Sequence, residues 1–174
     1  MKGSTYLTIV VAALASVAAF TVHGSGAEEK TAAPMFVTTI PPGYRDWRLV
    51  SVAREEGSLN DIRAILGNDK AIEAYRGGKL PFPDRTMIAR LAWSYDRSEE
   101  NNKVFGGPQS YVAGHPKNGV QFMVKDSKKY ASTGGWGFAQ FDEGKSADDA
   151  VLKACYPCHQ AVADRDFVFT RYAR

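Results

Sequence analysis

The chain has 174 residues, of which 44% are hydrophobic and 24% charged, and its formal net charge is +3. This composition is typical of a globular protein with one domain and a substantial core. Basic residues form no stripe along the sequence, so we expect no nucleic-acid partner.

An apolar segment opens the chain. Lys2 is followed by an uncharged run from Leu7 to Val22, and Ser25-Gly26-Ala27 provides small residues for cleavage. This pattern predicts a signal peptide over residues 1–27 and a periplasmic or secreted protein. The run of about 16 residues is shorter than the roughly 20 that span a bilayer. We therefore expect no stable membrane span after cleavage, and an uncleaved N-terminal anchor is the alternative.

The segments after the signal peptide mix helix and strand patterns. Residues 28–40 are expected to form an N-terminal arm that leads into a single domain over residues 41–174. In that domain Trp47–Val52 is apolar enough for a strand, and Leu59–Leu66 and Asp69–Arg76 have short helical patterns. Gly77-Gly78 is a natural helix stop. The prolines of Leu80–Asp84 favour an extended or turn conformation.

The second half of the domain is richer in strand patterns. Thr86–Trp93 alternates, so that Met87, Ala89, Leu91 and Trp93 share one face and Ile88, Arg90 and Ala92 the other. Ser146–Asp149 resembles a capping box for a helix that runs into Cys155. Further strands are expected at Val120–Val124, Trp136–Phe141 and Phe167–Tyr172. The pattern predicts a mixed α+β fold and argues against a four-helix bundle, which needs four long amphipathic helices.

The chain's two cysteines belong to the sequence Cys155-Tyr156-Pro157-Cys158-His159. Cys-x-x-Cys-His attaches a c-type haem, because each thiol adds to a vinyl group and the histidine ligates the iron. We therefore predict one covalently attached haem held by Cys155 and Cys158, with His159 as the iron ligand. Attachment of such haems outside the bacterial cytoplasm agrees with the predicted export.

Three other uses of the cysteines fit the sequence less well. A Cys-x-x-Cys redox motif would follow an early strand, whereas this one is near the C-terminal end. A zinc site needs four ligands, and beyond the predicted signal peptide only His115 and His159 could join the cysteines, at poor spacing. A structural disulfide would close a loop too small to stabilise much.

An ordered set of motifs resembles the cytochrome P-460 family and its relative cytochrome c′-β. The resemblance covers residues 41–174. Its parts are Tyr44–Trp47, Tyr75–Asp84, Val124–Ser127, Gly135–Phe138, and the haem motif followed by Asp166–Arg171. It implies an antiparallel sheet with flanking helices, a frequent homodimer, and a haem iron with an open distal position. Cytochromes P-460 oxidise hydroxylamine, and cytochromes c′-β bind nitric oxide and carbon monoxide.

The resemblance therefore implies an exported mono-haem protein that binds or converts small nitrogen species, with a redox partner protein if it turns over. One departure weakens the oxidoreductase assignment. Cytochromes P-460 carry a strand lysine that bonds to the haem, and the alignment places Arg90 at that position. A guanidinium stays protonated and is a poor nucleophile. We predict that this cross-link is absent unless Lys79, in the preceding loop, replaces it.

Several residues are candidates for the remaining roles in the pocket. Phe82, Phe138 and Phe122 could form an apolar distal wall, although ordinary sheet core would explain them equally. Gln140 could donate a hydrogen bond to a ligand, and Asp84 could accept a proton, although an aspartate after proline commonly serves a turn. Arg90 could pair with a haem propionate or point into the pocket, with a surface charge as the alternative. Arg45 and Arg171 are further candidate propionate partners.

The alternative function is an electron-transfer cytochrome with both axial positions filled by the protein. Its sixth ligand would be Met87, Met123 or His115. Methionines inside strand patterns usually serve packing, and His115 precedes a proline in a glycine-rich loop.

Overall fold

The computed structural model describes residues 35–174, and the fold below refers to that part. The predicted signal peptide, residues 1–27, and residues 28–34 of the predicted arm lie outside it. Among the described residues, no helix combines the length and the apolar character needed to cross a membrane.

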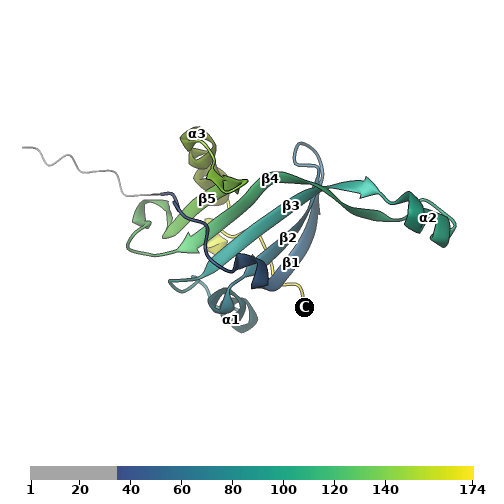
Figure 1. Cartoon of the computed structure of the whole chain (residues 1–174). Helices are drawn as coiled ribbons and strands as arrows, with labels where there is room; N and C mark the ends of the chain where they lie inside the picture. Colours follow the sequence, from purple (N-terminus) through teal and green to yellow (C-terminus); the bar gives the residue numbers. More distant parts are fainter. Residues whose placement is uncertain (1–34) are drawn as a thin grey trace, which may run out of the picture. The chain divides into compact units, whose positions relative to one another are not determined.

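Six antiparallel strands form one sheet in the order β1-β2-β3-β4-β5-β6 (Figure 1). The α+β prediction is therefore confirmed, as is the antiparallel sheet that the resemblance implied. The strands are β1 (Arg48–Glu55), β2 (Asp61–Gly67), β3 (Met87–Arg97), β4 (Tyr111–Lys125), β5 (Trp136–Asp142) and β6 (Lys145–Ser146). The helices are α1 (Asp69–Gly77), α2 (Glu99–Phe105), α3 (Asp149–Lys153) and α4 (Cys155–Gln160).

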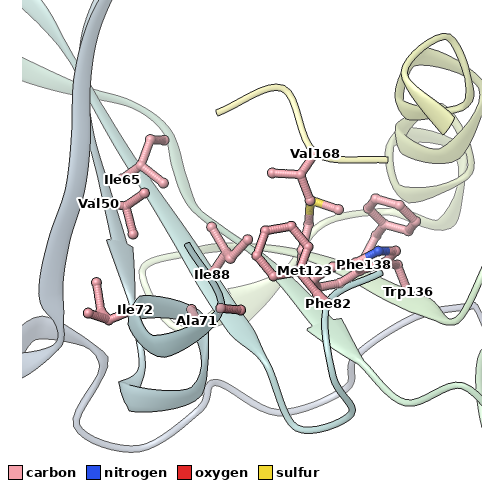
Figure 2. Packing of buried hydrophobic residues seen from close by; sticks show 11 residues of the cluster. Val50, Ile65, Ala71, Ile72, Phe82, Ile88, Met123, Trp136, Phe138 and Val168 are labelled. Carbon is pink, nitrogen blue, oxygen red and sulfur yellow. The ribbon is translucent and has the colours of Figure 1, made fainter. Parts of the chain in front are cut away.

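The two faces of the sheet bury different clusters. The face that carries Ile88, Met123 and Phe138 packs against α1 and the C-terminal segment, as Figure 2 shows. We call it the pocket face. The opposite face carries Ala89, Leu91, Phe122, Ala139 and Phe141, and residues 37–47 pack against it. The predicted alternation along Thr86–Trp93 is thus confirmed, because adjacent residues of a strand point to opposite faces.

The predicted N-terminal arm is anchored to the sheet edge in its described part. Phe36 forms a parallel bridge with Phe138, and the Val37 amide donates to the Phe138 carbonyl at 2.8 Å. Val37 is buried in the cluster of the opposite face. Residues 35–37 therefore cover part of the otherwise open edge of β5.

The helix predicted over Asp69–Arg76 is confirmed as α1, with a cap at each end. The Asn68 side chain accepts a hydrogen bond from the Ala71 amide at 3.0 Å, and Gly78 ends the helix in the left-handed conformation. The same Asn68 oxygen accepts from the Met87 amide at 3.1 Å, and its Nδ2 donates to the Arg85 carbonyl at 2.9 Å. Asn68 therefore joins α1 to the start of β3.

Replacing Asn68 with alanine is expected to lower the free energy of unfolding by about 1–2 kcal/mol, the usual cost of losing an N-cap. Urea unfolding followed by circular dichroism measures the change. Asn68→Ser retains a capping oxygen and should lose less. An Asn68→Ala variant as stable as the parent would show that the cap does not stabilise α1.

The helix predicted over Leu59–Leu66 is wrong, because this segment contains most of β2. Asp61 and Ile65 alternate with more exposed neighbours, and β2 pairs with β1 on one side and β3 on the other. The apolar spacing fits both periods over so short a run, and pairing on both sides decides for the strand.

Two expectations near the C-terminus also need correction. Ser146 ends β6 rather than capping a helix, and Asp148 occupies the N-cap position of α3 instead. The predicted single helix is divided in two, because α3 ends at Lys153 and α4 begins at Cys155. The predicted strand over Phe167–Tyr172 has no regular secondary structure. Asp166 and Phe167 have φ values of 51° and 64°, which interrupt an extended chain before it could join the sheet.

The β3–β4 hairpin is longer than the sequence patterns predicted. It extends away from the rest of the sheet and carries α2 (Figure 1). Ser98 caps α2 by accepting from the Asn101 amide at 3.3 Å. The outer end of the hairpin exposes Val104 and Phe105 of α2, whereas its base, with Ile88 and Met123, belongs to the pocket face.

Candidate functional site

A cavity of about 720 Å³ lies between the pocket face of the sheet and the C-terminal segments. Strands β1 to β5 provide its floor, and α3, α4 and residues 168–171 provide its other wall. The volume falls within the usual range for cofactor and ligand pockets. Cys155, Cys158 and His159 all line this cavity, so the haem motif faces its interior.

The His159 ring is held by a single polar contact. Its Nδ1 lies 2.7 Å from the carbonyl oxygen of Phe167. Because a carbonyl can only accept, the proton is on Nδ1 and the lone pair is on Nε2. Burial lowers the pKa of His159, against the opposing effect of the Phe167 carbonyl, and this favours the neutral imidazole that binds a metal.

The two cysteines are free thiols, one half-buried and one exposed. Burial raises the pKa of Cys155, with a smaller contribution from nearby Cys158, so its thiol stays protonated. Cys155 is the first residue of α4 and Cys158 lies in its middle. The same helix carries His159.

Two residues in the left-handed conformation, Asp166 and Phe167, turn the chain so that the Phe167 carbonyl meets His159. The Phe167 ring packs directly over Gly134, where a Cβ atom would overlap it. Glycine is therefore required at position 134 by this close approach as well as by its own φ of 66°.

A buried ion pair anchors the same turn. Lys125 Nζ lies 2.6 Å from Asp166 Oδ1, and the two side chains are 6% and 8% exposed. The Phe82 amide donates to Asp166 Oδ2 at 2.8 Å, and Trp136 Nε1 donates to the Asp166 carbonyl at 2.8 Å. Strands β4 and β5 and the loop at Phe82 thus fix the residue that precedes Phe167.

A row of polar side chains crosses the floor of the cavity. Arg90 donates to Asp61 Oδ2 at 2.6 Å and to Gln121 Oε1 at 2.8 Å, and Gln121 Nε2 donates to Gln140 Oε1 at 2.7 Å. Asp61 is fully buried and also accepts from Arg63 Nε at 2.8 Å. Arg90 therefore lies at the cavity, and its guanidinium is already bound by protein groups.

Of the aromatic residues predicted to wall the pocket, Phe138 lines the cavity, with its ring centroid 5.1 Å from that of His159. Phe82 is buried on the same face but packs against Tyr75 and Trp136 rather than lining the cavity. Phe122 points to the opposite face, where its ring meets Tyr44 edge-on. The structure thus brings Phe138 to His159, buries Phe82 away from the cavity, and lets Phe122 border the cavity while its ring packs on the opposite face.

Asp84 lies outside the cavity and is exposed. Its carboxylate accepts from the Ser127 hydroxyl and from the Ser127 amide, each at 2.8 Å. These two hydrogen bonds lower the pKa of Asp84. The residue therefore links the loop before β3 to the turn after β4, and the structure does not bring it together with the other candidate site residues.

Asp84→Asn is expected to destabilise the protein at neutral pH by less than about 1 kcal/mol, because the contact is exposed. A lowered folded-state pKa stabilises the protein above the unfolded pKa, and this contribution is lost as the pH falls through the folded pKa. The difference between variant and parent should therefore shrink below about pH 4. Urea unfolding at both pH values tests it, and a pH-independent difference would contradict the role.

The remaining candidates divide between the two sides of the sheet. Arg171 and Met123 line the cavity. Arg45 lines a smaller hollow on the opposite face, of about 260 Å³. Met87, Lys79 and His115 do not line the cavity; Lys79 is exposed near α1, and His115 is exposed on the β3–β4 hairpin.

The family description Cytochrome P460 matches residues 41–170. The chain belongs to the cytochrome P460 family. Among curated proteins, no match to the chain was found. The match covers the whole sheet, the Cys-x-x-Cys-His sequence and every residue that lines the cavity except Arg171, so the resemblance inferred from separate motifs is confirmed.

Membership of the cytochrome P460 family implies a c-type haem, and the residues present fit one. Two thiols and an imidazole line a single cavity, and the imidazole keeps Nε2 for a metal. Residues 35–174 hold no group of three or more His, Cys, Asp or Glu side chains placed to bind a metal ion directly. Two thiols and one imidazole on one cavity are a donor set suited to a tethered macrocycle that brings its own iron ligands.

Sequence reasoning missed the groups that support the site in this cytochrome P460 fold. Lys125 and Asp166 belong to two of the motifs that carry the family resemblance, but no role was predicted for them. No role was predicted for Gln121 or Asp61 either. The Phe167 carbonyl is a backbone group that every residue has, so the residue type at position 167 does not indicate its role. Only the strand register, which pairs Arg90 with Gln121 and Gln121 with Gln140, could have revealed the polar row.

Proposed function

We propose that the chain is an exported mono-haem c-type cytochrome that binds or converts small nitrogen species, such as nitric oxide and hydroxylamine, at an open iron position. The observation that carries the proposal is the shared cavity of Cys155, Cys158 and His159, with His159 Nδ1 bound to the Phe167 carbonyl. Family membership supports the same assignment.

In this proposal Cys155 and Cys158 hold the haem through thioethers, and His159 Nε2 ligates the iron. When bound, the haem supplies a coordination position for a small ligand and one-electron chemistry. The Phe167 carbonyl fixes the imidazole ring and raises its basicity, as partners of metal-bound histidines do. Phe138 excludes water beside His159. Arg171 is the cavity arginine best placed to meet a propionate, because Arg63 is bound to Asp61 and Arg90 to Asp61 and Gln121.

We expect no bond between the haem and a lysine. Arg90 occupies the position of the family's cross-linking lysine, Lys125 is paired with Asp166, and Lys79 is exposed outside the cavity. A haem–peptide bond beyond the two thioethers in denatured protein would contradict this. Without the cross-link, ligand binding is favoured over hydroxylamine oxidation, and assays of hydroxylamine turnover with an electron acceptor separate the two.

Absorption spectra of the reduced protein, recorded with and without nitric oxide and carbon monoxide, test the proposal. An open iron position predicts a high-spin spectrum that shifts with both gases. Met123 lines the cavity and is the candidate sixth ligand of an electron-transfer cytochrome. A low-spin spectrum unaffected by either gas would favour that second function.

The remaining parts of the proposal concern location and partners. A signal peptide over residues 1–27 would deliver the protein to the periplasm or outside the cell. A redox partner protein would be needed for turnover, and a homodimer is consistent with the family. N-terminal sequencing of the purified protein and its mass in solution test the cleavage point and the dimer.

A further inference from the structure

The hydrogen bonds of the polar row on the cavity floor are donated in one direction, from Arg90 to Gln121 and from Gln121 to Gln140. Arg90, Gln121 and Gln140 lie opposite one another on β3, β4 and β5, because the register pairs Arg90 with Gln121 and Gln121 with Gln140. The side chains are joined by hydrogen bonds of 2.8 and 2.7 Å. Asp61 holds the far side of the Arg90 guanidinium at 2.6 Å and is itself fully buried.

Chemistry sets the orientation of each amide in this row. A guanidinium has donors and no acceptor, so Gln121 must present its carbonyl oxygen to Arg90. The other end of the Gln121 amide is then its NH₂ group, which can only donate. Gln140 must accept that bond with its own Oε1, and its NH₂ group is consequently the end that remains. The charge on Arg90 thereby fixes the Gln140 amide two strands away.

The remaining NH₂ group of Gln140 belongs to a side chain that lines the same cavity as His159. Within residues 35–174 no hydrogen bond uses Gln140 Nε2, and it is not among the fully buried atoms that lack a partner. It is therefore a donor open to the cavity. The cavity wall around it is mainly apolar, with Ile88, Met123 and Phe138 in the neighbouring row.

We propose that Gln140 donates a hydrogen bond to the outer atom of a ligand bound in the cavity, and that Arg90 and Gln121 are positioning residues that hold it as a donor. The inference rests on the proposed function and deepens it. It selects small ligands whose outer atom accepts a hydrogen bond, such as nitric oxide and nitrite.

The row also explains why arginine occupies position 90. Its planar fork binds Asp61 through one nitrogen and Gln121 through another at the same time. A lysine ammonium is a point charge on a flexible stem and would not hold both partners in one geometry. Arg63, which shares Asp61, keeps that carboxylate in place from the other side.

Carbon monoxide bound to the reduced protein is the probe. A donor near its oxygen draws electron density into the C–O antibonding orbital and lowers the stretching frequency, whereas a carbonyl oxygen there raises it. Gln140→Leu removes the amide and gives the reference frequency. Gln121→Glu changes one NH₂ group to oxygen and offers Gln140 only acceptors, so the Gln140 amide should reverse and present its oxygen to the ligand.

The expected order of the C–O frequency is parent lowest, Gln140→Leu higher, and Gln121→Glu highest. Gln109→Glu adds the same charge at an exposed glutamine outside the cavity and should match the parent. Gln140→Leu should also bind nitrite up to about tenfold more weakly, the usual value of one hydrogen bond, with a smaller effect on carbon monoxide.

Equal C–O frequencies in the parent and Gln140→Leu would overturn the donor role of Gln140. A C–O frequency of Gln121→Glu equal to that of the parent would overturn the positioning role of Gln121. Both outcomes leave the proposed function standing, because carbon monoxide has bound. An iron that binds neither carbon monoxide nor nitric oxide would overturn the proposed function and this inference together.

Discussion

Replacing Lys125 with methionine is expected to lower the free energy of unfolding by about 3–5 kcal/mol. The substitution leaves the Asp166 carboxylate buried without its cation, and a buried unpaired charge is among the costliest defects in a protein core. The lysine side chain is also 5.0 Å from the Trp136 ring and donates to the Gly134 carbonyl at 3.0 Å. Urea unfolding of the purified protein measures the loss.

Two further variants separate the effect of the unpaired Asp166 charge from the effect of removing the lysine side chain. Lys125→Met combined with Asp166→Asn removes the unpaired charge and should recover part of the stability. Lys103→Met, at an exposed position on α2, should leave stability within about 0.5 kcal/mol of the parent. A double variant less stable than Lys125→Met alone would contradict the view that the charge causes the loss.

Phe138→Ala is expected to destabilise the protein by about 3–5 kcal/mol and to change the spectrum of the gas-bound iron. The ring is 3% exposed and packs against both His159 and Tyr156, so its removal leaves a cavity beside the imidazole. Urea unfolding measures the stability, and absorption spectra with nitric oxide or carbon monoxide measure the effect on the site.

Phe82→Ala is the matched control for this change. Phe82 is 5% exposed and belongs to the same buried cluster, but it does not line the cavity. It should cost a similar amount of stability and leave the gas-bound spectra close to those of the parent. Equal spectral changes in the two variants would show that Phe138 acts only as core.

The sequence was informative where a local pattern coincides with a local structure. Alternation identified β3 and its two faces, and the paired glycines marked the end of α1. The cysteine spacing predicts a haem site because it is a chemical requirement as well as a structural one, and the structure places Cys155, Cys158 and His159 on one cavity. The ordered motifs allowed the family to be recognised before the fold was known.

The errors arose where distant contacts decide between two local options. The run from Leu59 to Leu66 fits a helix or a strand, and β1 and β3 on either side make it a strand. The segment after Asp166 is apolar like a strand, yet its left-handed turn brings Phe167 to His159 instead. Phe122 and Phe138 share an aromatic character, and only the register assigns them to opposite faces.

The supporting residues of the site illustrate the same limit. Lys125 and Asp166 are 41 positions apart, and Arg90 and Asp61 are 29 apart. Lys125, Asp166 and Asp61 look like ordinary surface charges in the sequence, and burial makes each pair structural. Such long-range pairs follow from the fold rather than from local residue patterns.

The central claim is that Cys155 and Cys158 tether a haem whose iron is bound by His159. The most direct measurement is peptide mapping of the purified, denatured protein after extraction with acidified organic solvent. The account predicts that the colour stays with the polypeptide and maps to the single peptide that contains Cys155 and Cys158. Colour that passes wholly into the solvent, or maps to a peptide without these cysteines, would contradict it.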